Sequence, residues 1–207
     1  PLRQLTGQAE FNEIYLTDAR VAEADRLGDV GDGWRVTLTT LMNERVAIGG
    51  ETRSSDKGTI DWVMEAWRDH GHDDPARRDD LMRLWVRSEA LRLNNMRAEQ
   101  SRETGTPGPE GSIGKVLSAE FNKDAFAFAL GLSGMAGTLF DAGYEQDQTR
   151  PALDYDSLVE YFLRVRANSI EGGTTEVMRN ILGERVLGLP GDVRVDKDVP
   201  WIEVPRS

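Results

Sequence analysis

The chain has 207 residues, enough for one domain or for one domain and part of another. Its formal net charge of −11 argues against a surface that binds nucleic acid or an anionic membrane. The absence of cysteine excludes disulfides, thiolate metal sites and a cysteine nucleophile, and two histidines leave little material for a metal centre. No apolar run is long enough to span a bilayer. Because the chain begins at Pro1 and not at Met, we expect it to be cut from a longer protein.

The first thirty residues differ in pattern from the rest. Residues 11–17 alternate imperfectly and contain the β-formers Ile14, Tyr15 and Leu16, so they predict a strand. A single strand cannot satisfy its own backbone hydrogen bonds. Residues 1–30 are therefore interpreted as the tail of a sheet domain that lies mostly upstream.

From Trp34 onward the apolar residues recur at helical spacing and predict a helical bundle over residues 31–190. The expected helices cover 34–67 (as one helix, or as two joined near Gly49 and Gly50), 81–96, 113–128, 158–165 and 177–186. The segment 125–137 is apolar nearly all round, so we expect another element or another subunit to cover it. Residues 191–207 are expected to form an extended tail.

Two carboxylates are candidates for acid–base chemistry. Glu44 precedes Arg45 inside an apolar stretch, where the pair is either an ordinary surface ion pair or a partly buried base whose pKa burial raises. Glu171 precedes Gly172 and Gly173 in a turn, where we expect solvent to keep its pKa near the ordinary value. The turn itself is either a plain connection or a site for a polarised group at a helix N-terminus, with Thr174 or Thr175 as the cap.

Three further features have ordinary structural interpretations beside functional ones. The small residues of Gly131-Leu-Ser-Gly-Met-Ala-Gly137 favour tight helix packing, with close approach of a cofactor as the alternative. Arg68 is typical of a cationic last helical turn. His70 and His72 lack a third ligand nearby, so we interpret them as loop histidines and predict no metal site.

Three segments carry a resemblance to a known family. They are Phe11-Asn-Glu-Ile-Tyr-Leu-Thr-Asp-Ala-Arg-Val21, Asn43-Glu-Arg-Val-Ala-Ile-Gly49 and Gly173-Thr-Thr-Glu-Val-Met-Arg-Asn-Ile-Leu-Gly-Glu-Arg-Val-Leu-Gly188. In this order they resemble the acyl-CoA dehydrogenase family, in which the last strands of a middle β domain lead into a C-terminal four-helix bundle. The tail from Asp196 to Trp201 is similar to that of actinobacterial members.

The resemblance implies an FAD-dependent enzyme that desaturates acyl-CoA thioesters between the α and β carbons. A glutamate removes the α-proton, the β-hydrogen leaves as hydride, and the electrons pass to electron-transfer flavoprotein. The family also implies a cytoplasmic homodimer or homotetramer assembled through the bundle. The N-terminal helical domain and most of the β domain of the family have no counterpart in these 207 residues, so we expect this chain alone to be inactive.

The resemblance also implies a base. The commonest base in the family directly precedes the Gly-Thr of the final-helix signature, and Gly172 stands there in this chain. Isovaleryl-type and long-chain-type members instead carry the base on the first bundle helix, directly before an arginine. Glu44-Arg45 is similar to that arrangement, so the resemblance implies Glu44 as base, with Glu171 as the second choice.

The remaining site residues come from the same resemblance. It implies substrate contacts from Arg45, Gly172 and Gly173, and cofactor contacts from Arg68, Thr174 and Glu176. Arg68 resembles an arginine that contacts the FAD pyrophosphate across a dimer interface, although His70-Gly71 replaces the usual Phe-Gly. The glycine-rich flavin contact of the family is represented only by residues 130–137.

Two other functions remain open at this point. Gly172 favours a non-catalytic partner subunit that contributes the bundle and part of a flavin site to a hetero-oligomer. A flavin oxidase or monooxygenase on the same scaffold is the other alternative. The sequence does not discriminate acyl chain length or branching.

Overall fold

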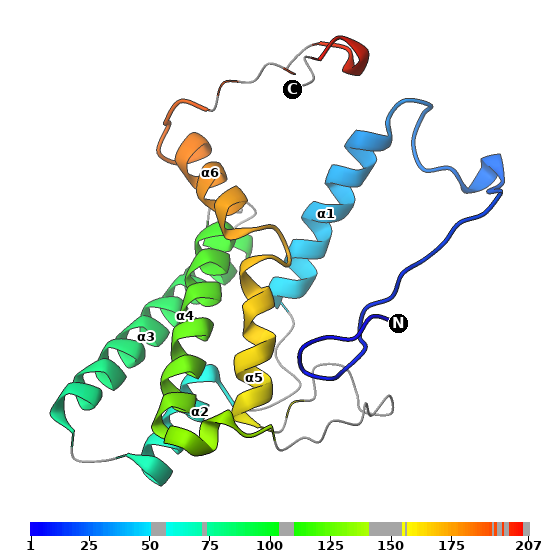
Figure 1. The fold of residues 1–207 in the computed structure, drawn as a ribbon. Helices are drawn as coiled ribbons and strands as arrows, with labels where there is room; N and C mark the ends of the chain where they lie inside the picture. Colours follow the sequence, from blue (N-terminus) through cyan, green and yellow to red (C-terminus); the bar gives the residue numbers. More distant parts are fainter. Residues whose placement is uncertain are drawn as a thin grey trace.

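The computed structural model is mainly helical (Figure 1). It describes residues 1–50, 57–71, 74–103, 110–140, 155, 157–191, 193, 196 and 199–204, without the side chains at 42–50, 102, 110 and 201. The α-helices are α1 (Gly33–Gly50), α2 (Thr59–His70), α3 (Pro75–Glu103), α4 (Glu110–Leu132), α5 (Leu158–Arg164) and α6 (Thr175–Arg185). The short 3-10 helices are η1 (Glu23–Asp25), η2 (Gly134–Thr138), η3 (Val165–Ser169) and η4 (Trp201–Glu203). The predicted helical domain is confirmed, and the segment 34–67 forms two helices.

The strand predicted at residues 11–17 is wrong for this chain. Within residues 1–30 the structure has one isolated antiparallel bridge, which joins Leu2 to Phe11. The side chains of Ile14, Tyr15 and Leu16 are about four-fifths exposed. A strand needs a neighbour to complete its hydrogen-bond ladder, and the described part of this chain offers none beyond that bridge. The assignment of residues 1–30 to a sheet domain stays a prediction.

Local capping explains where the helices begin. The Asp74 carboxylate accepts a hydrogen bond from the Ala76 backbone N–H at 2.9 Å, and Pro75 takes the first helical position of α3, where no backbone donor is needed. The Ser157 hydroxyl accepts from the Glu160 N–H at the start of α5. The predicted break at residues 70–75 is confirmed, since α2 ends at His70 and α3 begins at Pro75.

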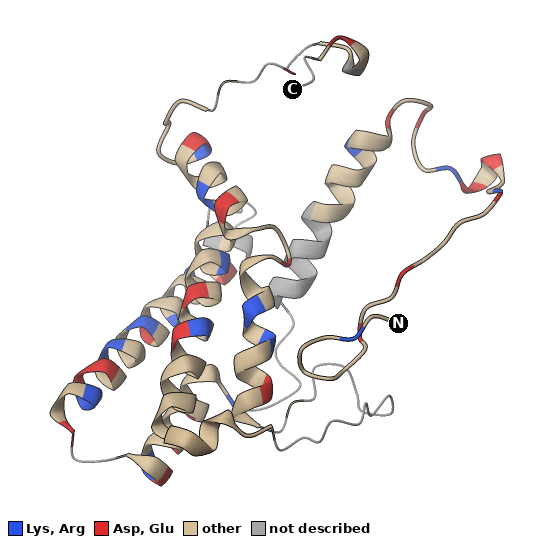
Figure 2. Ribbon diagram, viewed as in Figure 1, with Lys and Arg blue, Asp and Glu red and all other residues tan. Residues whose placement is uncertain are grey.

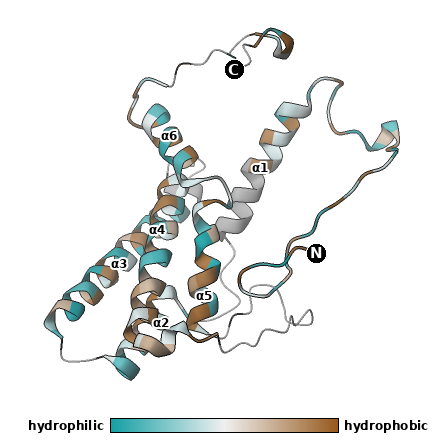
Figure 3. Cartoon of the chain, in the orientation of Figure 1, coloured by the Kyte–Doolittle hydropathy of each residue, from teal (hydrophilic) through white to brown (hydrophobic). Residues whose placement is uncertain are grey.

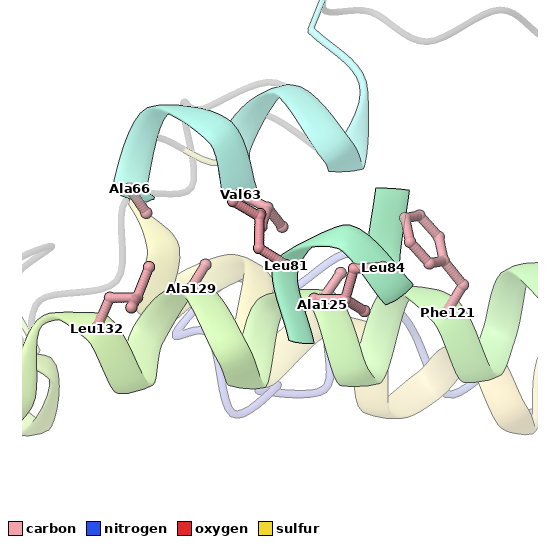
Figure 4. Close-up of a cluster of buried hydrophobic side chains, with 8 residues drawn as sticks. All are labelled: Val63, Ala66, Leu81, Leu84, Phe121, Ala125, Ala129 and Leu132. Atoms are coloured by element: carbon pink, nitrogen blue, oxygen red, sulfur yellow. The ribbon is translucent and has the colours of Figure 1, made fainter. Parts of the chain in front are cut away.

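The core is an apolar seam where α2, α3 and α4 meet (Figure 4). The seam consists of Val63 and Ala66 from α2, Leu81 and Leu84 from α3, and Phe121, Ala125, Ala129 and Leu132 from α4. On each helix these positions are three or four residues apart, which places them on one face. Ala125 and Ala129 of α4 have small side chains, so α2 and α3 can pack close to the backbone of α4.

The helix α4 is the centre of the bundle because it packs against α2, α3, α5, η3 and α6 (Figure 1). Its side toward α5 includes Phe126, whose ring stacks on that of Tyr161 at a centroid distance of 4.9 Å. The prediction that another element covers the apolar stretch from residue 125 is therefore confirmed for α4. Beyond the end of α4, the side chain of Met135 is exposed.

The helices α1 and α3 differ from α4 in exposure. In α1 the side chains of Trp34, Leu38 and Leu41 are exposed, and that of Val36 is half-buried. The outer side of α3 carries interleaved basic and acidic residues (Figure 2), and the hydropathy view places the apolar positions of the bundle on the inner helices (Figure 3). Among the described residues, no helix is both long and apolar enough to cross a membrane.

Candidate functional site

The turn between η3 and α6 has an unusual backbone. Gly172 and Gly173 both have positive φ, at 65° and 98°, which glycine adopts without the penalty that a side chain brings. Thr174 follows and caps α6, since its Oγ1 accepts from the Val177 N–H at 3.2 Å. The prediction that one of the two threonines caps this helix is confirmed, with Thr174 in that position.

Two backbone donors of this turn are weakly engaged within the part of the chain that the structure describes. The N–H groups of Gly172 and Gly173 make no hydrogen bond of good geometry to a described residue, although Gly173 closes the turn over residues 170–172. They lie directly before the N-terminus of α6, where the helix dipole favours negative charge. The turn can therefore stabilise charge that develops on an oxygen atom placed against it.

Glu171 is held by two side chains. Arg164 donates to both carboxylate oxygens, with Nη1 to Oε1 at 3.2 Å and Nη2 to Oε2 at 2.9 Å. The Asn168 Nδ2 donates to Oε1 at 2.6 Å. Partial burial pushes the pKa of Glu171 upward, but the hydrogen bonds and charge of Arg164 outweigh it, so the pKa is lowered. The prediction that this pKa stays ordinary is wrong, because Arg164 lies within hydrogen-bond distance.

The other acidic residue near the turn is Glu176, in the first turn of α6. Its side chain is exposed, and its pKa is lowered by a hydrogen bond from its own backbone N–H and then by one from the Thr174 side chain. The exposed, ionised carboxylate of Glu176 is available to polar groups of a ligand. It does not lie in a dry pocket, where a base that takes a proton from carbon would be expected.

The candidate base and its neighbour lie in α1. The backbone of Glu44 and Arg45 is helical as predicted, and their side chains lie outside the described residues. The choice between a surface ion pair and a partly buried base therefore remains open. His72 also lies outside the described residues, whereas His70 is the last residue of α2.

Arg68, which the resemblance predicts as a cofactor contact, lies at the end of the bundle away from the Gly172–Gly173 turn. It is exposed in the last turn of α2, as predicted for a cationic helix end. An open hollow of about 320 Å³ lies at the C-terminal end of α4. The hollow is lined by Asp74, Arg77, Gly131, Leu132 and Gly134, so part of the predicted glycine-rich contact borders it.

The predicted cofactor residues are not brought together within one chain. Lys115, whose Nζ donates to the Asn168 carbonyl beside the turn, and Leu132, which lines the hollow, are about 25 Å apart at the helical rise of α4. The turn with Thr174 and the hollow near Arg68 therefore belong to opposite ends of the bundle. A single extended ligand could contact both sets of residues only if one chain contributed the turn and a second chain contributed the end that carries Arg68.

Sequence reasoning missed Arg164 and Asn168. Arg164 precedes Glu171 by seven residues, a spacing that places two residues on one face of a continuous helix. In this chain α5 gives way to η3 between them, so the pair forms across a helix end. The opposite charges at that spacing were the only sequence signal, and it is a weak one.

The comparisons with known proteins agree with the fold. The sequence profile described as "Acyl-CoA dehydrogenase, C-terminal domain" matches residues 31–187. The acyl-CoA dehydrogenase IpdE1 of Mycolicibacterium smegmatis is 35% identical over 198 residues, which is 94% of this chain and 46% of that protein. The acyl-CoA dehydrogenase FadE34 of Mycobacterium tuberculosis is 30% identical over 191 residues. The chain spans about half the length of the IpdE1 proteins it matches.

Solved structures give the same result. The structure titled "Tcur3481-Tcur3483 steroid ACAD" superposes with a TM-score of 0.66 at 25% identity, over 86% of this chain and 45% of that chain. The ChsE4-ChsE5 complex from Mycobacterium tuberculosis shares the fold, with a TM-score of 0.60. The helical bundle, the turn before its last helix and the matched profile together assign this chain to the acyl-CoA dehydrogenase family, of which it contains the C-terminal domain.

Proposed function

We propose that this chain is the C-terminal part of an FAD-dependent acyl-CoA dehydrogenase and that Glu44 is its base. The observation that carries the proposal is the pair of N–H groups at Gly172 and Gly173, neither of which makes a hydrogen bond of good geometry to a described residue. Desaturation of a thioester puts negative charge on the thioester oxygen as the α-proton leaves, and two such backbone donors suit that charge. FAD, when bound, accepts the hydride that leaves the β carbon.

The residues of this chain have separate tasks in the proposal. Glu44 takes the α-proton, and Arg45 contacts the substrate next to it. The Gly172 and Gly173 amides hold the thioester oxygen. Glu171 is a poor choice of base in this arrangement, because Arg164 stabilises its ionised form and occupies both carboxylate oxygens.

The residues fit FAD when two chains contribute them. Thr174 and Glu176 lie at the turn, where the flavin end would bind. Arg68 is a cation with no ion-pair partner among the described residues, and it lies near a hollow bordered by glycines, which suits a phosphate-bearing group from a partner chain. The titles of the two structures above each name a pair of proteins, which supports an assembly of more than one chain.

The relatives suggest the substrate class to test first. One similar structure is titled a "steroid ACAD", so acyl-CoA thioesters with a steroid-derived acyl group head the panel, followed by straight-chain and branched thioesters. Electron-transfer flavoprotein is the proposed electron acceptor.

The test is flavin reduction by acyl-CoA in the complete FAD-loaded protein. Glu44→Gln keeps the shape of the side chain and removes its basicity, so flavin reduction should slow by about 10²–10⁴-fold. Glu99→Gln, an exposed position on α3, is the matched control and should leave the rate unchanged. An unchanged rate in Glu44→Gln would contradict the assignment of the base.

A second candidate function is a non-catalytic subunit of a hetero-oligomer. It is favoured by Gly172, which has no side chain at the commonest base position, and by the engagement of Glu171 with Arg164. If the protein reduces no flavin by itself but becomes active with a second dehydrogenase chain, and Glu44→Gln leaves that activity unchanged, this candidate replaces the first.

A further inference from the structure

We infer that Arg164 is a positioning residue that holds the Gly172–Gly173 turn in place through Glu171; the inference rests on the proposed role of the turn. Arg164 is the last residue of α5, and its side chain is only 15% exposed. Its two terminal nitrogens meet the two oxygens of Glu171 in a fork-to-fork pair. Such pairs fix direction as well as distance, because the guanidinium is planar.

The Glu171 carboxylate is also linked to α4, through Asn168. Asn168 donates to Glu171, and the Asn168 side-chain oxygen accepts from Asn122 Nδ2 at 3.1 Å. The backbone carbonyl of Asn168 accepts from Lys115 Nζ. Both Asn122 and Lys115 belong to α4, so the residue before the two glycines is tied to the central helix as well as to α5.

Two further groups act on the charge of Arg164. The charges of Glu10 and Tyr155 both favour the protonated guanidinium, which raises the pKa of Arg164 together with Glu171. The Tyr155 hydroxyl lies 3.4 Å from both carboxylate oxygens of Glu10, and Gln4 Nε2 donates to the same carboxylate at 3.0 Å. The guanidinium therefore interacts with one carboxylate from the N-terminal segment and with another from the turn.

The turn needs such support because its own backbone supplies little. Two consecutive glycines have more conformations available than any other pair of residues. Their N–H groups make no hydrogen bond of good geometry to a described residue, so backbone contacts hold them only weakly. Their position is set by the residues on either side, which are Glu171 and the helix cap Thr174. Arg164 thus determines where the two donors point without touching the substrate.

The experiment compares Arg164→Gln, Arg164→Lys and Glu171→Gln in the 207-residue chain by NMR. In Arg164→Gln the titration midpoint of the Glu171 carboxyl should rise, and the Gly172 and Gly173 amide signals should shift. Arg164→Lys keeps the charge but loses the fork, so its effects should be intermediate. Arg83→Gln breaks an exposed ion pair with Asp79 on α3 and is the matched control. It should move neither signal.

A kinetic arm uses the same variants in the complete FAD-loaded protein. Misplaced donors weaken transition-state contacts, so Arg164→Gln should lower kcat by roughly tenfold to a hundredfold with a smaller change in KM. The double variant Arg164→Gln/Glu171→Gln should be no worse than either single variant, because both act through one contact. Effects that multiply would overturn the inference, as would unshifted Gly172 and Gly173 signals in a folded Arg164→Gln chain.

The two arms separate this inference from the proposed function. If the complete protein reduces no flavin with any acyl-CoA, the proposed function fails, and the NMR arm still decides whether Arg164 positions the turn. If Arg164→Gln fails to fold, as judged by its circular dichroism, Arg164→Lys decides. Unshifted glycine signals in that variant overturn the inference, and shifted signals support it.

Discussion

The two sides of α4 are built from different chemistry. The side toward α2 and α3 is an apolar seam whose members include Phe121, Ala125 and Ala129. The side toward η3 carries Lys115 and Asn122, which hydrogen-bond to Asn168 beside the turn. Apolar contacts act without direction and sum to stability, whereas hydrogen bonds depend on geometry. The comparison indicates that the seam stabilises the domain and the polar side fixes the position of the candidate site.

The largest expected effect tests the seam. Leu81→Ala removes a side chain that is 2% exposed at the centre of the seam, so the free energy of unfolding should fall by about 2–5 kcal/mol. Leu93→Ala on the same helix removes a side chain that is 55% exposed and should cost less than about 1 kcal/mol. Urea unfolding of both variants measures the difference. Equal costs would mean that the seam is not the core.

The next effect tests the polar side. Asn122→Ala removes the acceptor of the Thr59 hydroxyl and the donor to Asn168, and Thr59 is buried. Losing these two hydrogen bonds should cost about 1–3 kcal/mol of unfolding free energy. The Gly172 and Gly173 amide signals should also shift, whereas folded Leu81→Ala should leave them in place. Asn180→Ala, at an exposed position on α6, is the control. Glycine shifts of equal size in Leu81→Ala would break the comparison.

The smallest effect concerns the helix that follows the turn. Thr174→Ala removes the cap of α6 and should lower the free energy of unfolding by about 1 kcal/mol. Thr40→Ala, within α1, removes only a hydroxyl that bonds back to the Val36 carbonyl, and it should change stability by less than about half as much. Thermal unfolding of the two variants decides between them. A null effect at Thr174 would mean that the cap contributes nothing.

The helical part of the fold was predictable because each helix has its own periodicity and breaking residues. The break at residues 70–75 and the cap at Thr174 are local features, so the sequence pattern contains them. The absence of a strand at 11–17 was not predictable from a local pattern, because a strand forms only beside another strand. The β-formers Ile14, Tyr15 and Leu16 remain exposed in this chain for that reason.

The candidate site was predictable only in outline. The turn could be recognised from its two glycines and a capping threonine. Its support could not, because the contacts of Arg164 with Glu171, Tyr155 and Glu10 depend on how α5 packs and where the N-terminal segment lies. Such contacts join residues that are distant in sequence, and a hydrophobicity pattern carries no information about them.

The two glycines of the turn differ as starting points for evolution. A Cβ atom added at Gly172 would meet nothing within 4 Å, whereas one at Gly173 would lie 2.7 Å from Met178 Cε. A side chain can therefore enter at Gly172 at the cost of backbone strain alone, of order 1–3 kcal/mol. The glycine codons GGA and GGG each become a glutamate codon by a single base change. A lineage in which one of them encodes Gly172 could thus acquire a carboxylate at the commonest base position in one mutational step without rebuilding the surrounding helices, while the same step at Gly173 would require the end of the Met178 side chain to move.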